Sequence, residues 1–248
     1  MILGIIPARF GSTRFPGKPL IDISGKSMIQ RVYVQAKKSK SMAKVVVATD
    51  DERIAQHVKR FGGEFVMTNQ HHTSGTDRCF EALQKTEGTY DFVINLQGDE
   101  PFIDPSQIDL LAELLNEDQT ELATLAIPVN SSELLFNESE VKVVLNKDKE
   151  ALYFSRNVIP FLSGIDKKEW HKKYNYYRHV GIYAYRKDVL EKVTRLAPSS
   201  LEKAESLEQL RWLENGFNIK VGITHFESHC IDTPEDVERV LKLTGKAH

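Results

Sequence analysis

Apolar runs of strand length alternate with amphipathic segments over the first 70 residues of the chain. The runs have the composition of strands buried on both faces and occupy residues 2–6, 44–49 and 64–68. We expect the first strand to end at Pro7, because proline cannot donate to a central ladder. Between the runs, apolar residues recur at helical spacing after Ser27 and after Asp50 or Asp51, which are residue types that cap helices. This alternation predicts a parallel sheet with right-handed crossovers.

The pattern continues in the middle and at the end of the chain. Further buried strands are predicted at residues 92–96, 121–129 and 218–224. Helices are predicted to begin at Asp104-Pro105 and at Thr233-Pro234, where proline takes the first helical position.

Residues 141–185 have a different pattern, with longer alternating and aromatic-rich segments. They predict a mixed or antiparallel extension of the sheet, in which the basic stretch 166–173 is a loop. We therefore expect a single α/β domain over residues 1–248. Its sheet is mostly parallel and doubly wound, and the mixed or antiparallel extension lies around residues 140–186.

Composition and charge narrow the class of protein. The 248 residues are 41% hydrophobic and 27% charged, and the formal net charge is −2, so no global basic field indicates nucleic acid as a partner. No run approaches the roughly 18 apolar residues of a membrane span, and the first strand begins without a signal-peptide pattern. We expect a cytoplasmic protein without a membrane anchor, in which Cys79 and Cys230 stay reduced.

Candidate chemistry begins in the loop directly after the first strand. Glycines there let backbone N–H groups approach phosphate oxygens, and cations complete such a cradle with charge-assisted hydrogen bonds. The loop also follows the carboxyl end of a buried strand, where open α/β sheets bind ligands. We interpret it as a phosphate-binding loop rather than a solvated basic surface. Its polar residues are Arg9, Ser12, Thr13, Arg14 and Lys18.

Two common nucleotide-binding motifs are excluded by spacing. Gly-x-x-x-x-Gly-Lys-Ser/Thr fails because five residues separate Gly11 from Gly17, and because Pro19 follows Lys18. Gly-x-Gly-x-x-Gly is absent from the chain, which argues against a nicotinamide or flavin enzyme.

An acidic turn follows the apolar run at residues 92–96. Asp99 would lie at the same edge of the sheet as the basic loop. A carboxylate that faces several cations and a polyphosphate is explained by Mg²⁺, which binds one or two carboxylates together with phosphate oxygens and water. A turn-forming Gly-Asp without a ligand is the alternative.

Several motifs together resemble one family. Residues 7–19, Pro-Ala-Arg-Phe-Gly-Ser-Thr-Arg-Phe-Pro-Gly-Lys-Pro, resemble the N-terminal signature of sugar nucleotidylyltransferases, most closely the cytidylyltransferases that activate 3-deoxy-manno-octulosonate (Kdo). Ser-Gly-Thr-Asp-Arg at 74–78, Gln-Gly-Asp-Glu-Pro at 97–101 and Ile-Asp-Thr-Pro-Glu-Asp at 231–236 resemble further motifs of that family. The resemblance covers nearly the whole chain and implies an α/β fold of the nucleotide-diphospho-sugar transferase type.

The resemblance implies a role for each group of residues. Arg9, Arg14 and Lys18 would be catalytic cations at the triphosphate, and Ser12, Ser74 and Arg78 would bind the nucleotide, the last two at the cytosine base. Asp99 and Asp232 would be the Mg²⁺ ligands. The family has glycine where this chain has Cys230, which puts the local geometry beside Asp232 in question.

The acceptor sugar acid needs a cation for its carboxylate and polar groups for its hydroxyls. Candidates by residue type are Arg156, Arg178, His179, Tyr183 and Gln209. The resemblance does not retain Arg178 and adds Gln97, so the implied acceptor-binding residues are Gln97, Arg156, His179, Tyr183 and Gln209. After Arg156 the family usually continues with Ser-Pro, whereas this chain has Asn157-Val158, so an amino-substituted relative such as 8-amino-Kdo stays open.

The implied activity is transfer of a cytidylyl group from CTP to Kdo, which yields CMP-Kdo and pyrophosphate for lipopolysaccharide biosynthesis. The implied assembly is a homodimer formed through the extension, with Mg²⁺ as cofactor and no nucleic-acid or membrane partner. One alternative is another sugar nucleotidylyltransferase of the same fold, such as a sialic-acid cytidylyltransferase. The other is a non-catalytic nucleotide-binding regulator, which would need neither Asp99 nor Asp232.

Overall fold

The structure is a computed structural model that describes residues 1–11, 15–117, 119–227 and 229–243. The chain forms two compact units, the first from Met1–Ala112 with Ser228–His248 and the second from Glu113–Glu227. The predicted extension at residues 140–186 lies within the second unit. That the whole chain behaves as a single domain stays a prediction.

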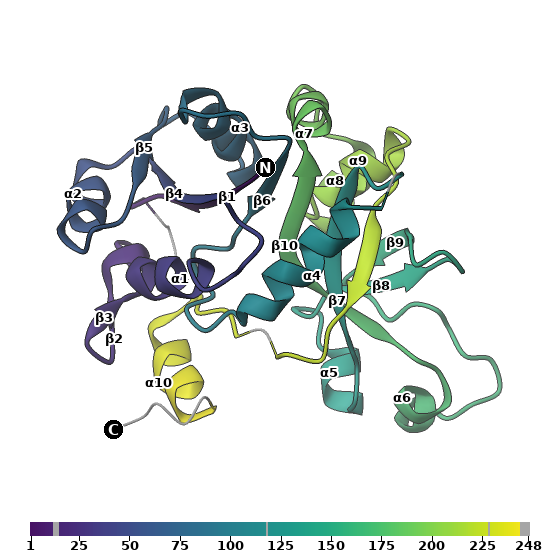
Figure 1. Ribbon diagram of the computed structural model, residues 1–248. Helices are drawn as coiled ribbons and strands as arrows, with labels where there is room; N and C mark the ends of the chain where they lie inside the picture. The colour runs from purple at the N-terminus through teal and green to yellow at the C-terminus, as the bar shows by residue number, and fades with distance from the viewer. Residues whose placement is uncertain (12–14, 118, 228, 244–248) are drawn as a thin grey trace. The chain divides into compact units, whose positions relative to one another are not determined.

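The first unit is a parallel α/β layer. Its strands stand in the order β6, β1, β4, β5 and all pair in parallel; they are β1 (Ile2–Ala8), β4 (Lys44–Thr49), β5 (Phe65–Met67) and β6 (Phe92–Asn95). Helices α1 (Met28–Ala36) and α3 (Gly75–Lys85) cover opposite faces of this layer, and α2 (Glu52–Arg60) follows β4 (Figure 1). The predicted parallel strands and capped helices of this part of the chain are confirmed.

Short elements complete the first unit. Ser27 and Asp51 cap α1 and α2 with their side chains, as predicted. The unit also contains a 3₁₀ turn, η1 (Lys18–Leu20), a two-stranded hairpin of β2 (Asp22–Ile23) and β3 (Lys26–Ser27), and the C-terminal α10 (Pro234–Leu243). Helix α4 (Pro105–Leu115) leads from the first unit into the second.

Strand β1 does not end where the sequence predicted. It continues through Pro7 to Ala8, and Pro7 pairs in register with Ala48 of β4. On its other side, β1 pairs with β6 only as far as Ile5, opposite Asn95. Beyond that point no ladder bond is required from the Pro7 nitrogen, so proline is tolerated within the strand.

The second unit is a mixed sheet. The strand order is β11, β7, β10, β8, β9, in which β11 (Lys220–Ile223) and β7 (Leu122–Pro128) are parallel. The remaining pairs are antiparallel and involve β8 (Lys142–Leu145), β9 (Ala151–Ser155) and β10 (Tyr177–Arg186). The predicted mixed or antiparallel extension is therefore confirmed. The helices of this unit are α5 (Ser132–Phe136), η2 (Lys167–Glu169), α6 (Trp170–Lys173), α7 (Lys187–Thr194), α8 (Ser200–Glu205) and α9 (Gln209–Glu214).

The basic segment 166–173 was wrongly predicted to be a loop, since η2 and α6 occupy it. The Asp166 side chain accepts a hydrogen bond from the Lys168 N–H at the start of η2. Trp170 is buried and stacks on Tyr176, with ring centroids 6.5 Å apart. The buried Trp170 thus packs an otherwise charged segment against the rest of the unit.

Among the described residues, none of the helices has both the length and the apolar character needed to cross a membrane.

The turn that carries Asp99 touches the end of β1 closely. A Cβ atom at Gly98 would lie 2.8 Å from the Pro7 carbonyl oxygen, so only glycine allows the turn to approach the strand this far. At Gly75, a Cβ would make an ordinary contact of 3.5 Å with Pro7 Cγ.

We predict that Gly98→Ala lowers the free energy of unfolding by about 1–3 kcal/mol, because the new methyl group meets backbone that cannot rotate away. Gly75→Ala is the matched control. It should be neutral or stabilising by up to about 1 kcal/mol, since alanine is the better helix former. Urea denaturation of both variants measures the difference, and equal stability of the two would contradict the steric explanation.

Candidate active site

One cavity of about 280 Å³ lies in the first unit, at the carboxyl ends of β1 and β6. It brings together most of the first-unit residues that the sequence singled out. The predicted site residues that line it are Arg9, Lys18, Ser74, Arg78, Gln97, Asp99 and Asp232. Ser12 and Arg14 lie outside the described residues.

Lys18 reaches the cavity from a tight turn. Gly17 has the left-handed conformation, with φ of 74°, and its N–H donates to the Phe10 carbonyl at 3.0 Å. The η1 turn begins immediately afterwards with Lys18, and Pro19 fixes its second position. The glycine and the proline therefore turn the phosphate-loop candidate back toward the sheet and direct the lysine into the cavity.

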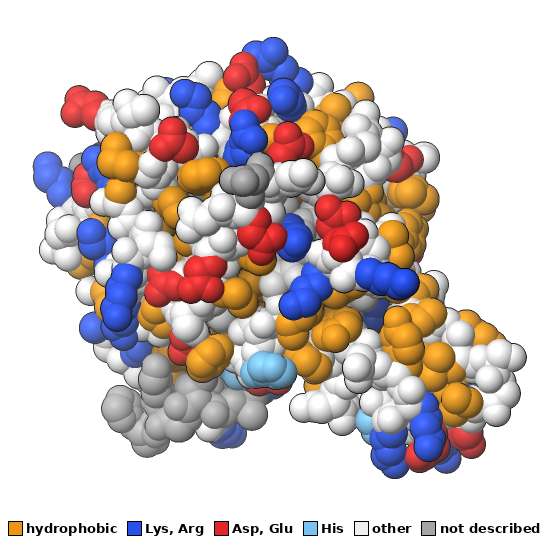
Figure 2. Space-filling model, turned by 45° about the vertical axis from the view of Figure 1, so that its right-hand side comes forward, with side chains coloured by type: hydrophobic (Ala, Val, Ile, Leu, Met, Phe, Trp, Pro, Cys, Tyr) orange, Lys and Arg blue, Asp and Glu red, His pale blue; other side chains and the backbone are white. Residues whose placement is uncertain are grey.

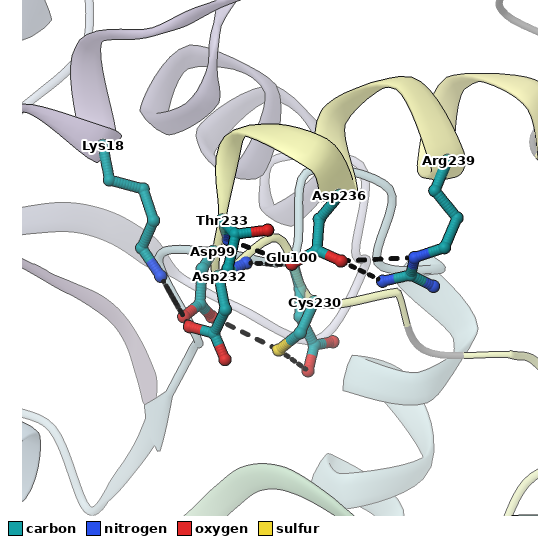
Figure 3. A network of polar contacts seen from close by, with 8 residues as sticks. All are labelled: Lys18, Asp99, Glu100, Cys230, Asp232, Thr233, Asp236 and Arg239. Carbon is teal, nitrogen blue, oxygen red and sulfur yellow. Dashed lines mark hydrogen bonds and ion pairs between the residues drawn. The ribbon is translucent and has the colours of Figure 1, made fainter. Parts of the chain in front are cut away.

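Asp232 lies beside Asp99 because a hydrophobic residue anchors its segment. Ile231 is fully buried in a cluster with Ile23, Met28 and Val240, and its N–H donates to the Asp99 carbonyl at 3.0 Å. On the other side, the Asp236 carboxylate accepts from the backbone N–H groups of Asp232 and Thr233 at 2.9 and 3.0 Å. The turn before α10 is thus held at both ends, and Figure 3 shows the end at Asp236.

The Lys18 ammonium stands between the two predicted metal ligands. Its Nζ atom donates to Asp99 Oδ2 at 2.8 Å and to Asp232 Oδ1 at 3.1 Å (Figure 3). Two oxygens within hydrogen-bond distance of one nitrogen are within about 6 Å of each other. Burial alone would lower the pKa of Lys18, but the carboxylates of Asp99 and Asp232 outweigh it and raise the pKa. The lysine is therefore charged, and the predicted proximity of the two carboxylates is present in the structure.

Cys230 adds a thiol to this acidic group. Its Sγ atom lies 3.6 Å from Asp99 Oδ1 and 3.8 Å from Glu100 Oε1 (Figure 3). Desolvation, reinforced by the neighbouring carboxylates, raises the pKa of Cys230 well above its usual value. The thiol stays protonated and acts as a weak donor. The departure from the family pattern at this position is thus accommodated beside Asp99.

Ser74 and Arg78 line the other part of the cavity, on α3. Ser74 Oγ accepts from the Asp77 N–H at 3.1 Å and caps the helix, which is the plain structural role that its residue type suggests. Arg78 is buried, and its guanidinium donates to Thr68 Oγ1 at 2.6 Å and pairs with Asp50 at 3.4 Å. Both side chains thus hold the wall in place besides facing the cavity.

His72 also lines the cavity, and the sequence did not single it out. Its Nε2 atom bonds the Glu81 carboxylate, which also accepts from the Asn69 N–H at 2.8 Å and pairs with Lys85 at 2.6 Å. Burial alone would raise the pKa of Glu81, but its bonds to Lys85, Asn69 and His72 lower it to about 2. Glu81 therefore fixes the loop before Ser74. No spacing rule points to a contact between residues nine positions apart on a loop and a helix.

The remaining acceptor candidates lie in the second unit. Arg156 follows β9, and its Nε donates to the Glu205 carbonyl at 2.9 Å, while the Glu205 carboxylate accepts from the Arg156 N–H at 3.0 Å. Gln209 is buried at the start of α9. Arg178, which the resemblance did not retain, is buried and paired with Glu140 and Glu227.

His179 and Tyr183 meet in an aromatic group. Their ring centroids are 5.2 Å apart, and Tyr183 packs edge-on against Trp212 at 5.0 Å. Burial raises the pKa of Tyr183 and lowers that of His179 to about 3. Near neutral pH both side chains are therefore uncharged, so they can only contribute hydrogen bonds and packing.

The fold and the cavity define an α/β protein that gathers cations and a pair of carboxylates at the carboxyl edge of parallel strands, where such folds bind phosphorylated ligands. A cytidylyltransferase family model matches residues 3–244. The curated 3-deoxy-manno-octulosonate cytidylyltransferase of Parabacteroides distasonis is 55% identical in an alignment of 243 residues that covers 96% of each chain. That of Porphyromonas gingivalis is 51% identical over 97% of this chain and 95% of its own. The chain therefore belongs to the cytidylyltransferase family, among the 3-deoxy-manno-octulosonate cytidylyltransferases.

Solved structures agree with this assignment. A CMP:2-keto-3-deoxy-manno-octonic acid synthetase complexed with CTP has a TM-score of 0.91 and 44% identity, over 99% of this chain and 98% of that one. The inositol-1-phosphate CTP transferase of T. maritima has a TM-score of 0.70 at 16% identity, over 98% and 95%, which shows a shared fold. The predicted nucleotide-diphospho-sugar transferase type of fold is confirmed.

We predict that the stabilising effect of Glu81 depends on pH. A carboxylate whose pKa falls to about 2 on folding contributes stability that is complete above its unfolded pKa of about 4.3 and is lost as the pH falls toward 2. Glu81→Gln should therefore cost up to about 3 kcal/mol at pH 6 and little at pH 2.5. Glu87→Gln, at an exposed carboxylate just beyond the same helix, is the control. Urea unfolding at both pH values measures the effect, and a cost that does not change with pH would show that only packing was altered.

Proposed function

We propose that the protein transfers a cytidylyl group from CTP to Kdo, giving CMP-Kdo and pyrophosphate. The observation that carries the proposal is the cavity in which Lys18 joins Asp99 and Asp232, close to Arg9, Ser74 and Arg78. The identity of the two substrates, CTP and Kdo, is inferred from membership in the cytidylyltransferase family. CMP-Kdo of this origin would serve lipopolysaccharide biosynthesis.

The reaction needs charge stabilisation rather than a protein nucleophile. The anomeric hydroxyl of the sugar forms the new bond to the α-phosphorus and loses its proton to solvent, while the bond from that phosphorus to the pyrophosphate oxygen breaks in line. Negative charge builds up on the departing pyrophosphate. Lys18 and Arg9, both in the cavity wall, stabilise that charge, and Arg14 is proposed to assist them.

The acidic pair fits Mg²⁺. In this structure an ammonium group lies between Asp99 and Asp232, so the protein already holds a positive charge between two carboxylates that belong to distant parts of the chain. Hard oxygen ligands, with phosphate oxygens completing the shell, are what Mg²⁺ prefers. When bound there, Mg²⁺ would supply Lewis-acid polarisation of the phosphate. Asp99 and Asp232 would hold it.

Nucleotide choice is assigned to Ser12, Ser74 and Arg78, and acceptor choice to Gln97, Arg156, His179, Tyr183 and Gln209. The proposal for Ser74 and Arg78 is that their structural bonds fix a wall complementary to cytosine. An 8-amino relative of Kdo is the second candidate acceptor, because Asn157-Val158 replaces the usual Ser-Pro of the family.

We also propose a cytoplasmic homodimer. Hydrophobic side chains gather on the surface that Figure 2 shows, and the large exposed ones of the second unit could be covered by a second copy. The exposed hydrophobic residues of the second unit are Phe136, Leu152, Phe161, Ile165, Tyr174 and Phe226. Sedimentation equilibrium tests the proposed dimer, and a monomer at micromolar concentration would contradict it.

Release of pyrophosphate tests the proposed reaction. The enzyme is incubated with Mg²⁺, with CTP or UTP, and with Kdo, 8-amino-Kdo or a sialic acid. Turnover with CTP and Kdo, well above that with UTP or sialic acid, is the expected result. Preference for sialic acid would assign a different acceptor, and nucleotide binding without turnover would favour a regulator.

We predict that Asp99→Asn and Asp232→Asn each lower kcat at least a hundredfold and raise the Mg²⁺ concentration that half-saturates the reaction. The double variant should be little worse than either single variant, because both carboxylates serve one assembly. Asp188→Asn is the control, since the Asp188 side chain is 49% exposed, pairs with Lys192 and does not line the cavity. Steady-state kinetics over a Mg²⁺ series measure this, and additive losses in the double variant would mean that the two carboxylates act separately.

A further inference from the structure

A break in strand pairing lies next to His179. Strand β10 runs antiparallel to β7, and its register shifts between Val180, opposite Leu125, and Tyr183, opposite Thr124. Two residues of β10, Gly181 and Ile182, are therefore extra relative to β7. Such bulges redirect side chains and are frequent near functional sites.

Thr124 fills this break. Its side chain is fully buried, and its hydroxyl oxygen lies 2.8 Å from the Ile182 carbonyl, 3.1 Å from the Val180 carbonyl and 3.0 Å from His179 Nε2. The two carbonyl oxygens can only accept hydrogen bonds, and the hydroxyl has one proton to donate. If the hydroxyl proton pointed to the histidine, lone pairs of the Thr124 oxygen would face lone pairs of both carbonyl oxygens. The proton therefore goes to a carbonyl, with Ile182 the nearer.

This choice fixes the histidine tautomer. A hydroxyl that donates to a carbonyl can only accept from the ring, so Nε2 must carry a proton. Burial lowers the pKa of His179 to about 3, so the ring holds one proton near neutral pH. Nδ1 is then a lone-pair acceptor. The plane of the ring is held by Phe154, whose centroid is 5.1 Å away, and by Tyr183.

We infer that Thr124 is a positioning residue that holds His179 as the neutral Nε2–H tautomer, so that Nδ1 accepts a hydrogen bond from a hydroxyl group of the acceptor sugar. The inference rests on the proposed acceptor role of His179. A lone pair repels a carboxylate, so the sugar's carboxylate must be bound elsewhere. An ammonium group also donates, so His179 does not discriminate between a hydroxyl and an amino substituent of the sugar.

Nitrogen NMR of the whole protein with ¹⁵N-labelled histidine tests the tautomer directly. His179→Asn identifies the His179 signals by their loss. Free enzyme at neutral pH should show a protonated Nε2 and a bare Nδ1, and addition of the sugar should shift the bare nitrogen toward lower frequency, as expected when it accepts a hydrogen bond. A Nδ1–H tautomer or an imidazolium in the wild-type protein would overturn the inference. This result does not depend on turnover, so it stands apart from failure of the proposed reaction.

Kinetics separate positioning from mere structural support. Thr124→Val removes the hydroxyl at nearly constant volume and should raise KM for the sugar about tenfold, with KM for CTP changed less than about twofold. Thr124→Ser keeps the hydroxyl and should restore both the KM and the wild-type ¹⁵N spectrum. Equal increases in both KM values, or a serine variant as impaired as valine despite a native circular dichroism spectrum, would overturn the role given to Thr124.

Discussion

The geometry of the first unit depends on one ammonium group between two carboxylates. Lys18 follows the first strand, Asp99 follows β6, and Asp232 precedes the last helix, yet the lysine bonds both acids at 2.8 and 3.1 Å. Without a cation, two carboxylates this close would repel each other and any polyphosphate. The ion pairs are partly buried, so water screens them less than a surface pair. The same arrangement that pairs these charges in the free protein is the one proposed to bind a cation and phosphate.

Packing makes this electrostatic arrangement possible. Gly98 lets the Asp99 turn touch the Pro7 carbonyl, and the buried Ile231 brings the segment before α10 against the Asp99 backbone. The second unit follows a different principle. His179 and Tyr183 are uncharged and are held by a threonine hydroxyl and by aromatic neighbours. Charged groups are thus proposed to bind the phosphates, and neutral donors and acceptors are proposed to bind the sugar.

Much of this architecture could be read from local sequence. Apolar runs gave β4 and β7 to within one residue, and capping residues gave the starts of α1, α2 and α10. The errors arose where distant partners decide the outcome. Pro7 remains within β1 because the pairing of β1 with β6 ends at Ile5. The charged segment around Trp170 is helical because Trp170 packs against aromatic residues such as Tyr176.

The candidate site divides in the same way. The basic loop was predicted from its position after a strand. The position of Asp99 suggested a metal ligand, but the family resemblance decided between that role and a turn without a ligand. Asp232 depended on the resemblance alone, since nothing local relates it to Asp99. Glu81 beneath His72 and Thr124 beside His179 were not predicted at all. Each is an ordinary residue type whose role comes from a contact across elements. Such contacts depend on strand register and packing, which cannot be predicted from a single sequence.

Divalent-ion binding in the absence of nucleotide tests the central claim most directly. Mn²⁺ can be counted by electron paramagnetic resonance in wild-type protein and in Lys18→Met, which removes the ammonium group but keeps an unbranched side chain of nearly the same length. If the ammonium occupies the cation position between Asp99 and Asp232, wild-type protein should bind Mn²⁺ weakly and Lys18→Met at least about tenfold more tightly, with the gain abolished by Asp99→Asn. Equal Mn²⁺ affinity in wild type and Lys18→Met would contradict the account.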